Sequence, residues 1–214
     1  WSAYDASRVA IWKRYYDTLQ LKSPGSYAIL EHFAANSEEI ELSNYGMLLW
    51  GNINYNFSEA AMGWIGTSNF DGALHVSRGW SQPYLVAYME SHDEERMMVK
   101  TRESGNASGG YDTKAFETAL DRMELCASFL LTMPGPKMIW QFGEQGYDYS
   151  INYCQDGSTN NNCRTDPKPI RWDYLQVPGR KDLYNVYKAL LQLRNNPLYA
   201  EAFTTGFISR NFSG

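Results

Sequence analysis

Apolar residues recur along the chain at two spacings, which predict helices and strands in turn. Large apolar residues at helical spacing run from Ser7 to Leu19, from Phe116 to Leu130 and through 183–191. Shorter apolar runs of strand length separate these segments. They are Ser26–Leu30, Met47–Trp50, Tyr84–Glu90 and Lys137–Phe142. Strands that alternate with helices are typical of βαβ units, so we predict an α/β fold with a parallel sheet.

Turn residues and polar stretches divide these elements. Pro24-Gly25 marks a turn after the first helix, and Pro134 ends the central one. The polar stretch Asn36–Glu41 carries no predicted element. Residues 51–84, which are rich in Gly, Asn and Trp, are expected to form mostly loop with one short helix near 58–64. Loops of such length are usually functional, so we expect a binding or catalytic role nearby.

Acidic residues stand where three of the predicted strands end. Glu31 follows the first strand, His92-Asp93 the third and Glu144 the fourth. Charged groups directly after a buried apolar run are costly in a core and are expected at a site or a rim. In a (β/α)8 barrel, catalytic groups come from the C-terminal ends of several strands. We therefore expect Glu31 and Asp93 to converge at one edge of a curved sheet.

The neighbours of Glu31 suggest a role for its carboxyl group. Ile29, Leu30 and Phe33 are apolar, and an apolar wall favours the neutral acid that can donate a proton. The alternative, an ion pair between Glu31 and a Lys or Arg across the barrel, stays open.

A metal site and a solvated helix start are two further interpretations of the His92-Asp93 segment. Adjacent residues on a strand point to opposite faces, so His92 and Asp93 are not expected to share an ion. We expect no metal site in this chain. Glu94, Glu95 and Arg96 have the acidic-first order of a solvated helix start.

Composition and charge exclude some partners and suggest one class of ligand. The formal net charge of -5 gives no reason to expect nucleic acid or an anionic membrane. No apolar run approaches the ~20 residues of a membrane-spanning helix. The chain has 16 Tyr, 9 Phe and 7 Trp, which suit either stacking on sugar rings or a large aromatic core. Both interpretations stay open for Tyr45, Trp50, Trp64 and Trp80.

The cysteines predict one local disulfide. Cys126 lies in an apolar helical stretch and is expected to be an inert core thiol. Cys154 and Cys163 bracket a polar loop. A disulfide between them would stabilise the fold by roughly 2–3 kcal/mol and imply an oxidising compartment. A zinc site is the weaker alternative, because no His or further Cys lies close in sequence.

Four segments resemble motifs of the α-amylase family, and they occur in the family's order. Tyr27–Phe33 resembles the fifth-strand motif, Val86–Arg96 the seventh and Pro134–Glu144 the eighth, while Lys168–Tyr174 also looks like this family. The resemblance implies strands five to eight of a (β/α)8 barrel with helices and long loops. Residues 1–205 would form the C-terminal half of the catalytic barrel, and 206–214 the start of a following β domain.

The resemblance also implies a retaining hydrolase of α-1,4-glucans that acts on starch and maltooligosaccharides. Glu31 would be the acid/base and Asp93 the transition-state stabiliser, with His92 as a hydrogen-bond donor to the reacting sugar. Further substrate contacts would come from His32, Tyr45, Trp50 and Arg96. Calcium is implied as a cofactor whose ligands lie outside this segment. The Glu31-His32-Phe33 variant resembles α-amylases of Bacteroidetes-type bacteria, so we expect an extracellular, cell-surface or periplasmic location.

One family motif is absent, which limits what the chain is expected to do alone. The family nucleophile lies in a Gly-x-Arg-x-Asp pattern that does not occur in this sequence. We expect that Asp upstream of Trp1, and we expect the chain alone not to hydrolyse starch. A half barrel exposes two sheet edges, so we expect an unstable monomer, a homodimer that closes the barrel, or a segment proteolysed from a whole enzyme. A related α-glucosidase or pullulanase and a non-catalytic starch-binding protein are the alternatives.

Overall fold

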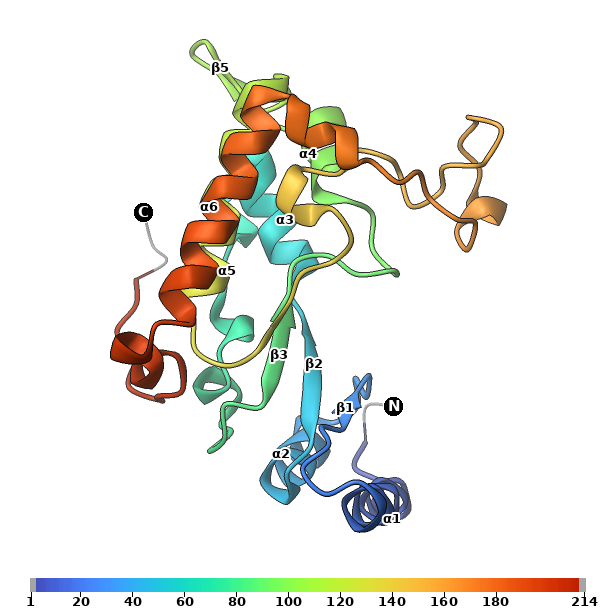
Figure 1. Ribbon diagram of the computed structural model, residues 1–214, viewed down its shortest axis with the longest axis vertical. Helices are drawn as coiled ribbons and strands as arrows, with labels where there is room; N and C mark the ends of the chain where they lie inside the picture. The colour runs from blue at the N-terminus through green and yellow to red at the C-terminus, as the bar shows by residue number, and fades with distance from the viewer. Residues whose placement is uncertain (1–2, 212–214) are drawn as a thin grey trace.

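A computed structural model describes residues 3–211 and contains a four-stranded parallel sheet with the strand order β1-β2-β3-β6 (Figure 1). The strands are β1 (Ile29–Leu30), β2 (Leu48–Asn52), β3 (Leu85–Tyr88) and β6 (Lys137–Met138). All three pairings in this sheet are parallel, and Trp50 lies opposite Val86 in the register of the central pair. The prediction of an α/β fold with a parallel sheet is confirmed.

Helices connect the strands and account for about half of the chain. The α-helices are α1 (Ala6–Lys22), α2 (Asn36–Tyr45), α3 (Asn54–Met62), α4 (Met97–Ser104), α5 (Phe116–Thr132) and α6 (Pro178–Arg194). A small antiparallel hairpin joins β4 (Ala107–Ser108) to β5 (Tyr111–Asp112). Short 3-10 helices are η1 (Ile65–Thr67), η2 (Asp71–Ala73), η3 (Val76–Arg78), η4 (Gly143–Gln145), η5 (Asn161–Cys163), η6 (Trp172–Gln176) and η7 (Pro197–Phe203).

The predicted helices begin and end at residues with a local reason to do so. The Asp5 carboxylate caps α1 by accepting hydrogen bonds from the backbone of Ser7 and Arg8. Pro178 opens α6, where its missing N–H costs nothing. α5 ends two residues before Pro134, which cannot continue a helix.

The helices pack on one face of the sheet around two apolar clusters. Leu30, Leu49 and Leu85 pack with the side chains of α1 and α2 near the start of the chain. Ala87 belongs to the larger cluster, which includes side chains from α3, α5 and α6. The other face is covered unevenly: Val86 and Tyr88 of β3 are buried, whereas Ile29 of β1 is 51% exposed.

Helix α2 corrects the sequence analysis, which predicted no element over Asn36–Glu41. Its first turn carries Glu38 and Glu39, acidic residues that a helix N-terminus stabilises. Both glutamates are nevertheless buried, because Arg8 pairs with Glu38 and Arg78 with Glu39. The polar segment therefore forms a packed helix, because its glutamates pair with arginines that are distant in the sequence.

Two further boundaries differ from the expectations. The short helix expected near 58–64 is α3, which begins earlier at Asn54. The last predicted strand is shorter than expected, because regular pairing of β6 stops at Met138. No helix among residues 3–211 is long and apolar enough to cross a bilayer.

The predicted start of a β domain at 206–214 falls partly outside the described residues, which end at 211. No strand is assigned over 206–211. Arg210 ties this segment back to the body through a 2.5 Å contact between its Nε and Asp71 Oδ1.

Candidate active site

Glu31, His92 and Asp93 meet at the C-terminal edge of the sheet. Glu31 follows β1 directly, and the other two lie beyond the end of β3. Each side chain offers one oxygen or nitrogen atom, and these atoms all lie within 4.8 Å of one another. The C-terminal ends of parallel strands share an edge, so residues 61 positions apart come together here. The convergence expected for Glu31 and Asp93 is present in the structure.

His92 and Asp93 point the same way, contrary to the argument from strand geometry. The chain leaves the extended conformation at Tyr88, so the alternation of side chains does not continue to His92. The Asp93 backbone N–H donates to Ser91 Oγ at 3.1 Å, which turns the chain. His92 Nε2 then lies 3.5 Å from Asp93 Oδ2. The two residues can therefore contact one ligand, including one ion.

Glu31 lies in a more open environment than its sequence neighbours suggested. The residue is exposed, and Ile29 and Phe33 beside it are 51% and 44% exposed. Glu31 lines a hollow of about 620 Å³ with Ile11, Trp12 and Phe33, but the residue stays exposed. No ion pair to a Lys or Arg within 4.0 Å is found for Glu31 among residues 3–211, so its oxygens are accessible to a ligand.

Two phenylalanines near this edge adopt backbone angles that are unusual for their residue type. Phe33 has φ of 45° and Phe142 has φ of 56°, and they are the two non-glycine residues with positive φ in the described chain. Bulky residues avoid this left-handed region, and such strain concentrates at functional sites. Phe33 follows Glu31 by two positions, and Phe142 follows the last strand of the sheet.

Aromatic rings line the cluster on the sheet side. The ring centroids of Trp50 and Trp140 lie 5.9 Å and 6.0 Å from that of His92. Trp50 also makes an edge contact with Tyr88 at 5.4 Å. Both tryptophans are half-buried, so each keeps part of its ring accessible to a sugar face.

Tyr88 supplies a buried hydroxyl below the carboxylates. Burial, and then the negative charges of Glu94 and Glu31, raise the pKa of Tyr88 above its usual range. Its phenol therefore stays protonated at neutral pH and keeps a hydrogen to donate.

A cavity of about 380 Å³ opens beside Asp93 and His92. Trp140 and Tyr149 give it aromatic walls, while Arg164 and Lys168 bring positive charge. The volume falls within the roughly 300–1,000 Å³ range of small-molecule sites. Aromatic surface, the Asp93 carboxylate and hydrogen-bond donors therefore meet in this cavity, whereas Glu31 lines a separate hollow.

Arg96 lines this cavity but is buried rather than solvated. Its Nη2 lies 3.1 Å from Glu90 Oε2 and donates to the Gln141 carbonyl at 2.6 Å. The residue is only 3% exposed. The predicted solvated helix start is therefore wrong for Arg96, whose charge orders the loop after β6.

Glu94 and Glu95 also make specific contacts, and α4 begins only at Met97. Glu94 accepts hydrogen bonds from Asn52 and from Ser91. Glu95 Oε1 accepts from the Ile151 backbone N–H at 2.9 Å. Glu94 therefore links the segment after β3 to β2, and Glu95 links it to the loop at Ile151. These two glutamates do not simply form a solvated face.

Other predicted site residues lie apart from the cluster. The His32 side chain is 2% exposed, and its Nε2 lies 2.8 Å from Glu38 Oε2. Tyr45 ends α2 just before β2, at the opposite edge of the sheet, where its hydroxyl donates to Asp17. Neither side chain belongs to the cluster of Glu31, His92 and Asp93.

The remaining candidates also have other surroundings. Glu144 lies beside α6, in a separate groove with Tyr184 and Lys188. Trp80 is buried and donates to Asn36 Oδ1 at 2.8 Å, which gives it a packing role. Trp64 donates to the Ser104 carbonyl at 3.3 Å.

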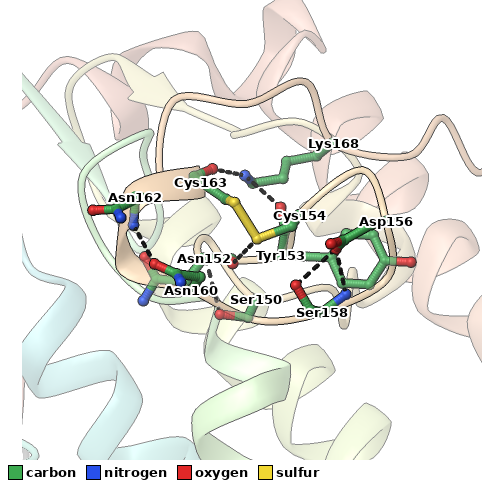
Figure 2. Close-up of a disulfide and its surroundings, with 10 residues drawn as sticks. All are labelled: Ser150, Asn152, Tyr153, Cys154, Asp156, Ser158, Asn160, Asn162, Cys163 and Lys168. Atoms are coloured by element: carbon green, nitrogen blue, oxygen red, sulfur yellow. Dashed lines mark hydrogen bonds between the residues drawn. A yellow bond between two sulfur atoms is a disulfide. The ribbon is translucent and has the colours of Figure 1, made fainter.

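The structure joins Cys154 and Cys163 with an S–S distance of 2.12 Å (Figure 2). Cys126 is a buried free thiol whose pKa burial raises to about 12, which agrees with an inert core residue. The sequence analysis missed Arg164, which follows Cys163 and contacts Asp93. The two residues are 71 positions apart, so no local pattern could have indicated the contact.

Comparisons with known proteins do not assign the chain to a family. No family model matches the sequence, and no curated protein matches it.

Proposed function

We propose that this chain carries part of the active site of an α-amylase-type glycoside hydrolase that cleaves α-1,4-glucans. The convergence of Glu31, His92 and Asp93 within 4.8 Å carries the proposal. Two carboxyl groups at the C-terminal edge of a parallel sheet, flanked by aromatic rings, are part of the set of groups that sugar hydrolysis needs. The motifs in which these residues lie support the same assignment.

The proposed roles follow from what each group can donate or stabilise. Glu31 is accessible and would protonate the leaving glycosidic oxygen. Asp93 would bind sugar hydroxyls and stabilise the positive charge that develops at the anomeric carbon. His92 would donate a hydrogen bond to the same sugar, and Trp50 and Trp140 would stack against neighbouring glucose rings. The nucleophilic carboxylate is proposed to come from chain outside these 214 residues.

The proposed architecture is the second half of a (β/α)8 barrel. In the described chain, β1 and β6 are the two edges of the sheet, and helices cover one face. Parallel sheets are normally covered on both faces, whereas Ile29 on the open face is 51% exposed. Further strands that extend the sheet at β1 or β6 would enclose Ile29 and Glu31. They would supply the apolar surroundings that a general acid needs.

Calcium, as the resemblance implies it, does not fit the residues described here. The group of at least three potential metal ligands among residues 3–211 is Glu31, His92 and Asp93. Calcium prefers six to eight oxygen ligands, and this group includes an imidazole. Any calcium site of the proposed enzyme would therefore use other residues. The disulfide supports a proposed extracellular, cell-surface or periplasmic location.

Isothermal titration calorimetry with maltoheptaose tests the proposed ligand, with cellohexaose as the β-linked control. We expect the chain to bind maltoheptaose in the millimolar range, about -4 kcal/mol, and to bind cellohexaose more weakly. Asp93→Asn and Glu31→Gln should each weaken maltoheptaose binding. Equal affinity for the two sugars, or no binding at all, would contradict the proposal.

The same chain is expected not to hydrolyse starch, because the nucleophile is proposed to lie elsewhere. A reducing-sugar assay over long incubation measures this. Turnover that Glu31→Gln abolishes would show that all the catalytic groups are present, and would overturn the prediction of a missing nucleophile.

A divalent transition-metal site is a second candidate, because one imidazole and two carboxylates converge here. Calorimetry with zinc chloride tests it, with His92→Ala as the variant that removes the imidazole. Micromolar zinc affinity lost in His92→Ala, without maltoheptaose binding, would favour a metal site. Maltoheptaose binding that is unchanged by a chelator would favour the glucan site.

A further inference from the structure

We propose that Arg164 is a positioning residue for Asp93, and that the Cys154–Cys163 disulfide holds Arg164 in place. The catalytic meaning of this arrangement rests on the proposed glucan site, whereas the positioning itself does not. Asp93 lies in the bend after β3, and Arg164 directly follows the disulfide-closed loop at 154–163. These two segments are far apart in the sequence.

The Arg164 side chain contacts both the backbone carbonyl and the carboxylate of Asp93. The Nη2 group donates to the Asp93 carbonyl oxygen and lies 3.5 Å from Asp93 Oδ1. A guanidinium group has several donors in a fixed plane, so it can hold a carbonyl and a carboxylate together. Asp93 is exposed, so these contacts add to the restraint that Ser91 and His92 place on it.

The loop that presents Arg164 is closed by covalent and polar contacts (Figure 2). The disulfide ends at Cys163, the residue directly before Arg164. Lys168 Nζ donates to the Cys163 carbonyl at 2.6 Å and to the Tyr153 carbonyl at 3.0 Å. These two bonds join the chain before and after the crosslink, so the backbone at Arg164 is fixed from both sides.

A second attachment ties the base of this loop to the segment that carries Asp93. Glu95 accepts hydrogen bonds from Ser150 Oγ at 2.5 Å and from the Ile151 backbone N–H at 2.9 Å. The bend after β3 is therefore held by the loop at two points, Glu95 and Asp93. With both in place, the Asp93 carboxylate is kept beside His92 and Glu31.

Hydrogen exchange measured by mass spectrometry tests the positioning without any sugar. We expect Arg164→Ala and the double variant Cys154→Ser/Cys163→Ser to speed exchange in peptides that cover 91–96 by roughly 2- to 10-fold. Peptides from α5 and α6 should not change. Arg210→Ala, which removes an exposed arginine paired with Asp71, is the matched control and should leave 91–96 unchanged.

Exchange that rises only in the loop at 150–168 would overturn the proposal, since Arg164 would then order its own loop alone. Unchanged exchange at 91–96 in both variants would also overturn it. Arg164→Lys keeps the charge and one donor, so it should restore slow exchange in part.

Maltoheptaose titration adds the functional readout. Arg164→Ala should weaken binding by roughly 2- to 10-fold, and Arg164→Lys should recover part of the loss. If the unmodified chain does not bind maltoheptaose, the proposed function fails while the exchange data still decide the positioning. Normal binding by Arg164→Ala would overturn the role of Arg164 in the glucan site.

Discussion

Two clusters in this protein each combine a glutamate, a histidine and a further charged residue, yet they are built in opposite ways. Glu38 is fully buried, and its oxygens accept hydrogen bonds from Arg8, His32 and the Asp5 backbone. Glu31, with His92 and Asp93, is exposed. In the Glu38 cluster, the carboxylate oxygens are hydrogen bonded within the protein. In the Glu31 cluster, the side chains are accessible to solvent and to a ligand.

The difference indicates where stability and function reside. A buried carboxylate that accepts several hydrogen bonds contributes to the free energy of folding. Its removal leaves the buried donors without an acceptor, which destabilises the fold. An exposed carboxylate beside another contributes little to folding, because water solvates it in the folded and unfolded chain alike. We therefore expect substitutions in the first cluster to change stability and those in the second to change ligand binding.

The largest expected effect is that of Glu38→Gln. The amide keeps one acceptor but loses the charge that pairs with Arg8 at 2.5 Å. We expect the free energy of unfolding to fall by roughly 1–3 kcal/mol, as measured by urea denaturation. Glu59→Gln, at a half-buried glutamate outside both clusters, is the control. An unchanged urea midpoint for Glu38→Gln would contradict the expectation that the Glu38 cluster stabilises the fold more than the Glu31 cluster does.

Acid should remove part of the same contribution. Hydrogen bonding to Arg8 lowers the pKa of Glu38 to about 2 from an ordinary value of 4.5. A lowered pKa in the folded state stabilises the fold above the ordinary value, and this stability is lost as pH falls from about 4.5 towards 2. Urea denaturation across this range should show a steeper loss in the unmodified protein than in Glu38→Gln. If the free energy of unfolding falls equally with pH in both proteins, Glu38 does not contribute the predicted pH-dependent stability.

A smaller effect is expected for Trp50→Leu, which removes an aromatic face beside His92. Maltoheptaose binding should weaken by roughly 2- to 10-fold, because stacking contributes about 0.5–1.5 kcal/mol. Trp64→Leu, at an exposed tryptophan hydrogen bonded to Ser104 outside the site, is the matched control. Equal losses in both variants would argue against stacking at Trp50.

The smallest effect on folding is expected for Glu31→Gln. No described partner depends on this carboxylate, so the free energy of unfolding should change by less than about 0.5 kcal/mol. Urea denaturation beside Glu38→Gln makes the comparison direct. A destabilisation as large as that of Glu38→Gln would show that Glu31 has a structural partner.

The strand ends could be predicted from the sequence, since short apolar runs followed by charged residues mark them locally. Glu31, His92 and Asp93 were found in this way, and the parallel sheet brings them together. Helix α2 could not be predicted, because its polar residues are buried by ion pairs with distant arginines.

The parts of the site that the sequence did not reveal depend on long-range contacts. Arg164 reaches Asp93 across 71 positions of chain, and His32 turns towards Glu38 rather than towards the sheet edge. His92 and Asp93 lie beyond the last residue of β3, so the alternation of side chains along a strand does not predict their common direction.

A crystal structure of the chain soaked with maltoheptaose tests the central claim most directly. The account predicts a glucose residue whose oxygens lie within about 2.6–3.2 Å of both Glu31 and Asp93, with Trp50 or Trp140 against a neighbouring ring. Sugar bound elsewhere with this edge empty, or Glu31 and Asp93 found on separate edges of the sheet, would contradict it.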